Sequence, residues 1–332
     1  MDPVTQAALG AAAAQSASKP ARFVAATWVG ALAGFLPDAD VLIRSSSDPL
    51  LFLDYHRHFT HSLAFIPIGG ALVAWLCSKF SRGRLAFREA LLPASLGWAS
   101  HGLLDSCTSY GTYLYWPFSN ERVAWHLVSI IDPLFTVPLL IGAIWAFRRR
   151  AAKIARLALL LALGYLALGS FQLQRAESVY AEFIAQRGHN PTVIEAKPSL
   201  GNNILFRAFY LQAGTYYADA VRVPWVGNPK VYAGQSHPAL DVKRYSAENN
   251  LSALHQADLA RFEYFSAGYL VADPRDPGVV SDFRYAAVPN QIAPLWGVDV
   301  LGTPAGRHLD WRQFRDIDAD DRSAFLDMLW GR

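Results

Sequence analysis

Charged residues, cysteines and long basic runs are scarce in this sequence. Charged side chains make up 17% of its 332 residues and hydrophobic side chains 52%, whereas soluble proteins carry about 25% charged residues. The two cysteines, Cys77 and Cys107, are too few for a disulfide framework. The net charge is only +3, and no long basic run indicates binding to nucleic acid. This composition argues against a soluble enzyme, a disulfide-rich secreted protein and a nucleic-acid-binding protein, and it favours a membrane protein.

Several hydrolase motifs are also missing. There is no His-Glu-x-x-His motif, which argues against a zinc protease of that type. There is no Gly-x-Ser-x-Gly elbow, which argues against a serine hydrolase built on that turn. His101 and Asp105 resemble one piece of the lipid phosphatases, but the Pro-Ser-Gly-His element of those enzymes is absent.

Five apolar runs approach or reach the length of about 20 residues that a membrane-spanning helix needs. They cover residues 21–36, 61–78, 90–104, 127–147 and 154–173. A shorter alanine-rich stretch, residues 4–18, precedes them and is interpreted as an interfacial helix or a half-span. We predict an α-helical transmembrane bundle of about five spans plus a short N-terminal helix, covering residues 1–173.

Basic residues orient this bundle, because loops rich in Lys and Arg stay in the cytoplasm. They lie before the first run, between the second and third runs, and between the fourth and fifth runs: Lys19, Arg22, Lys79, Arg82, Arg84, Arg88, Arg148, Arg149, Arg150, Lys153 and Arg156. The opposite ends of the runs then meet at the outer face of the membrane.

Ionisable residues gather at those same outer ends. They are Asp38 and Asp40 after the first run, His56, Arg57 and His61 at the start of the second, His101 and Asp105 at the end of the third, and Asp132 near the start of the fourth. Each has an ordinary explanation alone, such as a solvated loop for Asp-x-Asp or a helix cap for Asp132. Because ionisable groups beside membrane spans are costly, their convergence on one face indicates a functional site.

Metal binding is the chemistry that these side chains suggest. His101 and Asp105 are four residues apart on a helix, so both can face one site. Imidazole and carboxylate are common ligands of zinc, and they also suit manganese or iron. Such an ion lowers the pKa of a bound water and polarises the bond to be broken. Arg57 is expected either to hold an anionic group or to orient a ligand carboxylate.

The ordered motifs extend through the first 135 residues. They read MDPVT at residues 1–5 with Gly10, LPDAD at 36–40, HR at 56–57, THS at 60–62, HGLLD at 101–105, TSYGT at 108–112, WPFS at 116–119 and IDPLF at 131–135. With this series the chain resembles the YdjM-type predicted membrane-bound metal-dependent hydrolases. The resemblance implies a helical membrane protein with metal-type motifs, and it implies no particular substrate.

The chain departs from that family's pattern at two positions. Gln6 follows Thr5 where the family usually has His, and His58 stands where the family usually has Gly. If the family's His is a ligand, this chain lacks it unless His58 substitutes for it. A second metal ion is therefore an open question.

The order Asp, His and His-x-x-x-Asp is also similar to the ligand order of zinc-dependent phospholipase C and nuclease enzymes. This analogy implies that one metal ion, most often zinc, is held by Asp40, His61, His101 and Asp105. The same analogy places Asp38 and His56 either among the metal ligands or in contact with those ligands. We expect the catalytic residues to be Asp38, His56 and Arg57, and the general base remains open among Asp38, Asp40 and His56.

The composition changes near residue 174, and residues 174–332 are predicted to form a β-rich extramembrane domain in the periplasm. Residues 176–186 are predicted as helix, and residues 204–211, 215–223, 262–271 and 283–288 as strands. Helix returns at residues 319–330, with Asp318 or Asp320 as N-cap. Four histidines lack ligand-like neighbours in sequence and are interpreted as surface or loop residues: His189, His237, His255 and His308.

These observations predict a metal-dependent hydrolase of the bacterial inner membrane that acts on phosphoester or lipid-headgroup substrates at the outer leaflet. The expected partner is a membrane lipid or a small molecule of the envelope. Two alternatives stay open, namely a non-catalytic metal-binding or transport protein and an envelope scaffold. Transport would favour ionisable residues along the depth of the bundle, whereas here only Asp132 is expected to be embedded and the other candidate site residues gather at one end.

Overall fold

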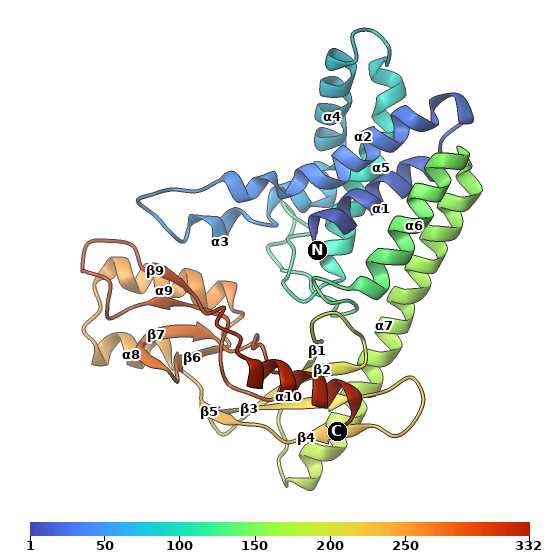
Figure 1. The fold of residues 1–332 in the computed structure, drawn as a ribbon. Coiled ribbons are helices and arrows are strands. Elements are labelled where there is room, and N and C mark those ends of the chain that lie inside the picture. The colour runs from blue at the N-terminus through green and yellow to red at the C-terminus, as the bar shows by residue number, and fades with distance from the viewer. The chain divides into compact units, whose positions relative to one another are not determined.

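The computed structural model describes all residues from 1 to 332 and divides them into two compact units (Figure 1). The first unit contains residues 1–42, 55–171 and 200–203, and the second contains residues 43–54, 172–199 and 204–332. Helix α7 (Ala152–Gln186) is continuous, and its residues belong to the first unit up to Phe171 and to the second from Gln172. Each unit is described below by itself.

The first unit is helical, and each of the five apolar runs contributes a helix. Its helices besides α7 are α1 (Pro3–Ser16), α2 (Phe23–Phe35), α4 (Ile66–Phe80), α5 (Phe87–Ser106) and α6 (Pro133–Arg149), joined in part by the 3-10 turns η1 (Pro20–Arg22), η2 (Leu36–Leu42), η3 (Phe59–His61) and η4 (Leu63–Phe65). Asp132 caps α6, because its carboxylate accepts hydrogen bonds from the backbone amides of Leu134 and Phe135. The predicted helical N-terminal region is confirmed.

The number of membrane spans is smaller than the sequence suggested. Two helical segments are long and apolar enough to cross a membrane, Leu63–Phe80 and Ala152–Gln186, rather than about five. Helices α2 and α6 are shorter, with 13 and 17 residues. Helix α5 has 20 residues, but charged Arg88 and Glu89 lie in its first turn and Asp105 near its end. Counting apolar runs in the sequence therefore overestimated the number of helices that are both long enough and apolar enough to span a membrane.

Glycines allow α1, α2 and α5 to cross at very short distances. A Cβ atom on Gly30 of α2 would lie 2.4 Å from the carbonyl oxygen of Gly10 in α1. A Cβ atom on Gly97 of α5 would lie 2.4 Å from the carbonyl oxygen of Gly30. Small residues at helix crossings let backbones approach closely, which is the usual packing device of membrane helices. This crossing places the end of α2, and the turn η2 after it, beside α5.

The second unit is built on two antiparallel sheets, which confirms the β-rich C-terminal region. The first sheet has the order β1 (Ile194–Pro198), β2 (Leu205–Gln212), β3 (Thr215–Arg222) and β4 (Lys230–Tyr232), with β5 (Ser236–Pro238) also paired to β3. The second sheet has the order β6 (Leu270–Asp273), β7 (Asp276–Asp282), β8 (Trp296–Asp299) and β9 (Asp310–Gln313). Its helices are α8 (Val242–Glu248), α9 (Ala253–Phe265) and α10 (Ala319–Trp330), and the short α3 (Leu51–Tyr55) lies mostly in the inserted segment 43–54.

Both faces of the first sheet are covered. Tyr180 and Ile184, from the C-terminal half of α7, pack with Phe206 and Tyr210 of β2 in one core. Phe209, on the other face of β2, packs with residues of the second sheet in another core. Side chains alternate between the two faces of a strand, and burial of both faces accounts for the nearly continuous burial of β2.

The structure corrects two predicted strands and confirms several other elements. Residues 262–271 contain the end of α9 and only the start of β6, because Leu259, Phe262 and Phe265 recur at helical spacing and are all buried. Residues 283–288 form no strand, only an isolated bridge at Ala286. The strands predicted at 204–211 and 215–223 correspond to β2 and β3, and residues 176–186 form the end of α7. Helix α10 begins after Asp318, as predicted.

Replacing Gly30 by Ala should destabilise the first unit, because the added Cβ would meet backbone atoms of α1. Overpacking of this kind costs about 1–3 kcal/mol, so we expect a lower Tm in detergent micelles. The matched control is Gly164→Ala in α7, where no atom lies within 4 Å of the added Cβ. There the better helix propensity of Ala should leave the Tm equal or raise it. Equal Tm values for the two variants would contradict the close crossing.

Candidate metal centre

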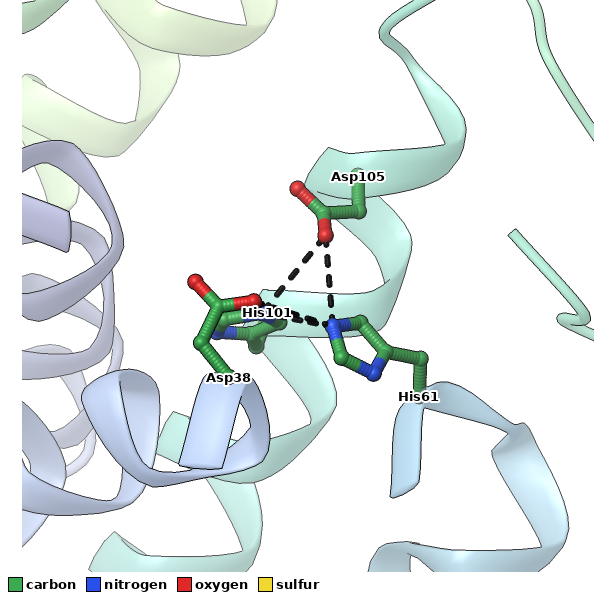
Figure 2. A group of neighbouring side chains, drawn as sticks. All are labelled: Asp38, His61, His101 and Asp105. Atoms are coloured by element: carbon green, nitrogen blue, oxygen red, sulfur yellow. Dashed lines mark hydrogen bonds and ion pairs between the residues drawn. The ribbon is translucent and has the colours of Figure 1, made fainter. Parts of the chain in front are cut away.

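Four potential ligands converge from three segments of the first unit. They are Asp38 of η2, His61 of η3, and His101 and Asp105 of α5. Figure 2 shows their side chains pointing toward one another. Gly102 permits the arrangement, because a Cβ there would lie 2.2 Å from the carbonyl oxygen of His61. The backbone of η3 can therefore lie directly against α5.

The spacing of the ligand atoms suits a single small cation. Nε2 of His61 lies 3.0 Å from Nε2 of His101. Asp38 Oδ1 lies 3.4 Å and 3.3 Å from these two nitrogens, and Asp105 Oδ2 lies 3.3 Å and 3.6 Å from them. Ligands placed tetrahedrally around zinc at its usual bond lengths are about 3.3 Å apart. These five distances, with all four ligand atoms within 4.8 Å of one another, suit one small cation bound by two nitrogen and two oxygen donors.

The outer nitrogens of both imidazoles are already occupied. Nδ1 of His101 lies 2.6 Å from the carbonyl oxygen of Gly34, which can only accept, so Nδ1 is inferred to donate. Nδ1 of His61 lies 3.2 Å from Asp40 Oδ2 and 2.9 Å from the hydroxyl of Thr60. In the neutral rings each Nε2 then carries a lone pair, and the two lone pairs face each other. A proton or a metal ion between them removes this repulsion. Carboxylate and carbonyl partners of this kind orient the histidine ligands of metals.

Asp105 supplies a second sign that the group fits a cation. Its Oδ2 atom is fully buried and faces Nε2 of both histidines at 3.3 Å and 3.6 Å and Nε of Arg57 at 3.1 Å. Its Oδ1 atom accepts a hydrogen bond from the Gln6 amide at 2.9 Å and contacts the amino group of Met1. Arg57 and the Met1 amino group pair with this buried carboxylate, while its Oδ2 is directed at the two histidines, where a cation would also contact it.

Asp40 supports the group rather than completing it. Its carboxylate accepts hydrogen bonds from the Thr60 hydroxyl at 2.8 Å and from the Arg57 backbone amide at 3.0 Å, and it lies 2.8 Å from His56 Nδ1. The sequence had suggested Asp40 as ligand and Asp38 as catalytic residue, whereas the geometry favours Asp38 as the fourth ligand. With about three residues per turn in η2, residues two apart face different directions. The Asp-x-Asp motif alone cannot tell which one faces the histidines.

The charges of the group also fit a cation. Burial alone raises the pKa of Asp38, but hydrogen bonds with His101 and His61 outweigh it and hold the pKa well below its usual value. Burial likewise raises the pKa of Asp40, and hydrogen bonds with His56 and His61 bring it below the usual range. His61 precedes the apolar span, which begins at Leu63. Burial lowers its pKa, but hydrogen bonds with Asp105, Asp38 and Asp40 raise it to about 10. The carboxylates therefore attract positive charge between the two rings.

The other two predicted catalytic residues have different surroundings. The side chain of His56 is 20% exposed, and its Nδ1 is held by Asp40. Arg57 is buried, with Nε 3.1 Å from Asp105 Oδ2 and Nη1 donating to the Thr108 hydroxyl at 2.9 Å. Of the two roles considered for Arg57, this position favours orienting a ligand carboxylate.

The remaining polar residues of the motifs divide between the site and its surroundings. Gln6 reaches Asp105, so the position where the family usually has His does lie beside the group. His58 packs against Tyr113 and Trp116, with ring centroids 4.6 Å and 5.5 Å away, and does not replace that His. Sequence reasoning missed the carbonyl of Gly34 and the hydroxyl of Thr60. A backbone carbonyl leaves no sequence signal, whereas Thr60 directly precedes a predicted ligand.

A second cluster of potential ligands lies in the second unit and is less suited to a cation. His308 Nδ1 lies 2.9 Å from Asp258 and 3.9 Å from Asp48, so His308 is not the isolated residue that the sequence suggested. Arg261 contacts both carboxylates, at 3.0 Å and 3.1 Å. His255 is also buried and not at the surface. The second cluster has only one imidazole, and Arg261 contacts both of its carboxylates, whereas the guanidinium of Arg57 contacts only Asp105 in the first group.

Comparisons with known proteins agree with the motif series. The model of the family described as YdjM inner membrane protein matches residues 1–176. The curated Escherichia coli (strain K12) protein named inner membrane protein YbcI is 34% identical over 107 residues, which is 31% of this chain and 61% of that protein. The chain therefore covers less than two thirds of this relative. No solved structure matches the chain.

Removing a ligand should remove the bound ion. We expect wild-type protein purified in detergent to hold about one divalent ion per chain, and His61→Ala and Asp105→Asn to hold much less, measured by plasma mass spectrometry. His308→Ala is the control and should keep the full metal content, because its cluster already contains Arg261. Equal metal content in the wild type and both site variants would overturn the assignment.

Proposed function

Because the chain belongs to the YdjM inner membrane protein family, we propose that it is a membrane-bound metal-dependent hydrolase that cleaves phosphoesters, including those of lipid headgroups, at the outer leaflet. The observation that carries this proposal is the convergence of two imidazole nitrogens and two carboxylate oxygens within 4.8 Å of one another. Zinc suits this donor set best, and manganese or iron also fit. When bound, such an ion supplies activation of water and polarisation of the scissile bond.

Exposure within the group supports access from one side. The side chains of His61, His101 and Asp105 are fully buried, whereas that of Asp38 is 21% exposed. Substrate and water therefore approach past Asp38. A phosphoester substrate is favoured because the ligand order is similar to that of zinc-dependent phospholipases and nucleases. A bound cation would also attract the phosphate, which the carboxylates alone would repel.

His56 is the residue best placed to transfer a proton. Asp40 holds its Nδ1 at 2.8 Å, and the ring lies at the partly exposed edge of the site. A carboxylate that orients one nitrogen leaves the other free to exchange a proton, as in acid–base catalysis by histidine. Arg57 serves as a positioning residue, because its guanidinium is buried against Asp105 and Thr108.

The distribution of basic residues supports an outward-facing site. The Arg156 side chain donates a hydrogen bond to the Ser16 carbonyl at 2.9 Å, at the C-terminal end of α1. Lys19, Arg22 and Arg88 line one cavity near that end, whereas Gln6, near the N-terminal end of α1, contacts Asp105. Basic loops stay in the cytoplasm, so the ligand group lies toward the periplasm. Helix α7 begins at the basic end, and the β-rich unit that follows it is then periplasmic.

One observation favours a second function. Structural zinc sites have four protein ligands, whereas catalytic sites usually have three and an open position. A site closed by Asp38 would bind metal without hydrolysis and would stabilise the crossing of α2, η3 and α5. Transport of the ion gains no support, because the ligand group lies at one end of α1 and α5.

Cysteine labelling tests the orientation. In a background with Cys77 and Cys107 replaced by Ala, single cysteines are placed at exposed Ala39 beside the ligands and exposed Arg84 in the basic loop. A membrane-impermeant maleimide applied to intact cells with a permeable outer membrane should label Ala39→Cys and spare Arg84→Cys. Arg84→Cys should react only after the inner membrane is opened. The opposite pattern would reverse the topology.

Replacing His56 by Ala tests catalysis separately from metal binding. The variant should keep its metal and lose hydrolysis of bis(p-nitrophenyl) phosphate by about 10²–10⁴-fold, because a general acid or base contributes this much. His308→Ala serves as control and should keep both properties. An unchanged rate in His56→Ala would exclude its role. A wild type that binds metal but hydrolyses neither this compound nor phosphatidylglycerol would favour the structural alternative.

A further inference from the structure

An apolar groove runs along α1, between α2 and α6. Its volume is about 500 Å³, within the range of small-molecule sites. Small side chains, Ala7, Ala8 and Ala11, line it from α1, whereas large side chains line it from the other helices, including Trp28 of α2 and Phe147 of α6. Lining residues at both ends are exposed, with Val4 at 56%, Phe35 at 48% and Trp28 at 68%, so the groove is open to its surroundings.

The two ends of the groove differ. At one end Gln15 donates hydrogen bonds to the Thr27 hydroxyl and to the Ala143 carbonyl, both at 3.1 Å, and so links α1, α2 and α6. At the other end the lining residues are Pro3 and Val4 of α1 and Phe35 of α2. Gln6, three residues after Pro3, contacts Asp105. The candidate ligand Asp38 lies three residues after Phe35. The open end of the groove therefore adjoins the candidate metal centre.

The dimensions restrict what can occupy the groove. Pro3 and Gln15 are separated by about 18 Å at 1.5 Å per helical residue, close to the depth of one leaflet, about 15 Å. The volume spread over this length gives a mean cross-section of about 28 Å². A single hydrocarbon chain, about 4 Å across by its carbon contact distances, fits.

We propose that this groove binds one acyl chain of a phospholipid and holds its phosphate-bearing headgroup at the metal centre. The proposal rests on the proposed function for the identity of the substrate and names a single-chain binding subsite for it. The apolar lining matches the acyl chain, the length matches one leaflet, and the polar ligand group lies where the headgroup would emerge.

Photolabelling tests the groove directly. The probe is a phosphatidylglycerol with a diazirine at the end of one palmitoyl-length chain, in vesicles of phosphatidylethanolamine and phosphatidylglycerol containing the full-length protein. In the wild type, labelled peptides should come mainly from α1, α2 and α6. Ala7→Leu and Ala31→Leu, both half-buried in the lining, should each lower this labelling about tenfold, the effect of losing contacts worth about two buried methylene groups.

The control substitution is Ala167→Leu on the exposed face of α7, which should leave the labelling unchanged. Metal content and hydrolysis of bis(p-nitrophenyl) phosphate should stay at the wild-type level in the groove variants, which shows that they are folded. Unchanged labelling in both groove variants, or label spread evenly over α4 and α7 as for bulk lipid, would overturn the proposal. Glycerol phosphate should not compete with the probe, whereas unlabelled phosphatidylglycerol should, because the chain provides the binding.

If the groove is labelled as expected but no phosphoester is cleaved, the acyl-chain site stands and the hydrolase assignment fails. If bis(p-nitrophenyl) phosphate is cleaved but the label ignores the groove, the hydrolase assignment stands and the acyl-chain site fails.

Discussion

The approach of two imidazole nitrogens to 3.0 Å is the constraint around which the first unit is organised. Two neutral rings whose other nitrogens already donate cannot stay this close without a positive charge between them. Each ring is fixed from behind, His101 by a backbone carbonyl and His61 by Asp40. The candidate ligand atoms are therefore already oriented by neighbouring groups, which lowers the reorganisation that binding a cation would require.

The helix crossing has to accommodate this polar centre. Gly10, Gly30 and Gly97 bring three backbones together, and Gly102 admits the backbone of His61. The same requirement puts ionisable side chains into α5, and this helix no longer qualifies as an apolar span. The candidate site requires ionisable side chains in α5, whereas a membrane-spanning helix requires apolar ones. The chain meets both by surrounding the polar groups with other helices.

Much of the first unit follows from sequence patterns. The five apolar runs gave five helices, and the motif residues His61, His101 and Asp105 were correctly grouped. The sequence could not decide which of Asp38 and Asp40 faces the histidines, because the Asp-x-Asp motif lies in a 3-10 turn, whose period differs from both strand and helix. The number of spans was overestimated because apolar runs do not reveal where helices start and stop.

The second unit was less predictable. Strands β2 and β3 alternate their side chains between two buried faces, and their aromatic and β-branched residues marked them clearly. The stretch 262–271 carries similar residues but begins inside α9, because Ser252 caps a helix upstream and Leu259, Phe262 and Phe265 fall on one face of it. Tertiary burial, rather than residue type, decides between helix and strand there.

Asp40 contacts two imidazoles, one at the edge of the candidate site and one within the ligand group. One of its oxygens lies beside His56, and the other faces His61. A change in charge at His61 therefore acts on the same carboxylate that holds Nδ1 of His56. If an ion binds at His61, its occupancy and the contact between Asp40 and His56 are linked, and by reciprocity each shifts the equilibrium of the other.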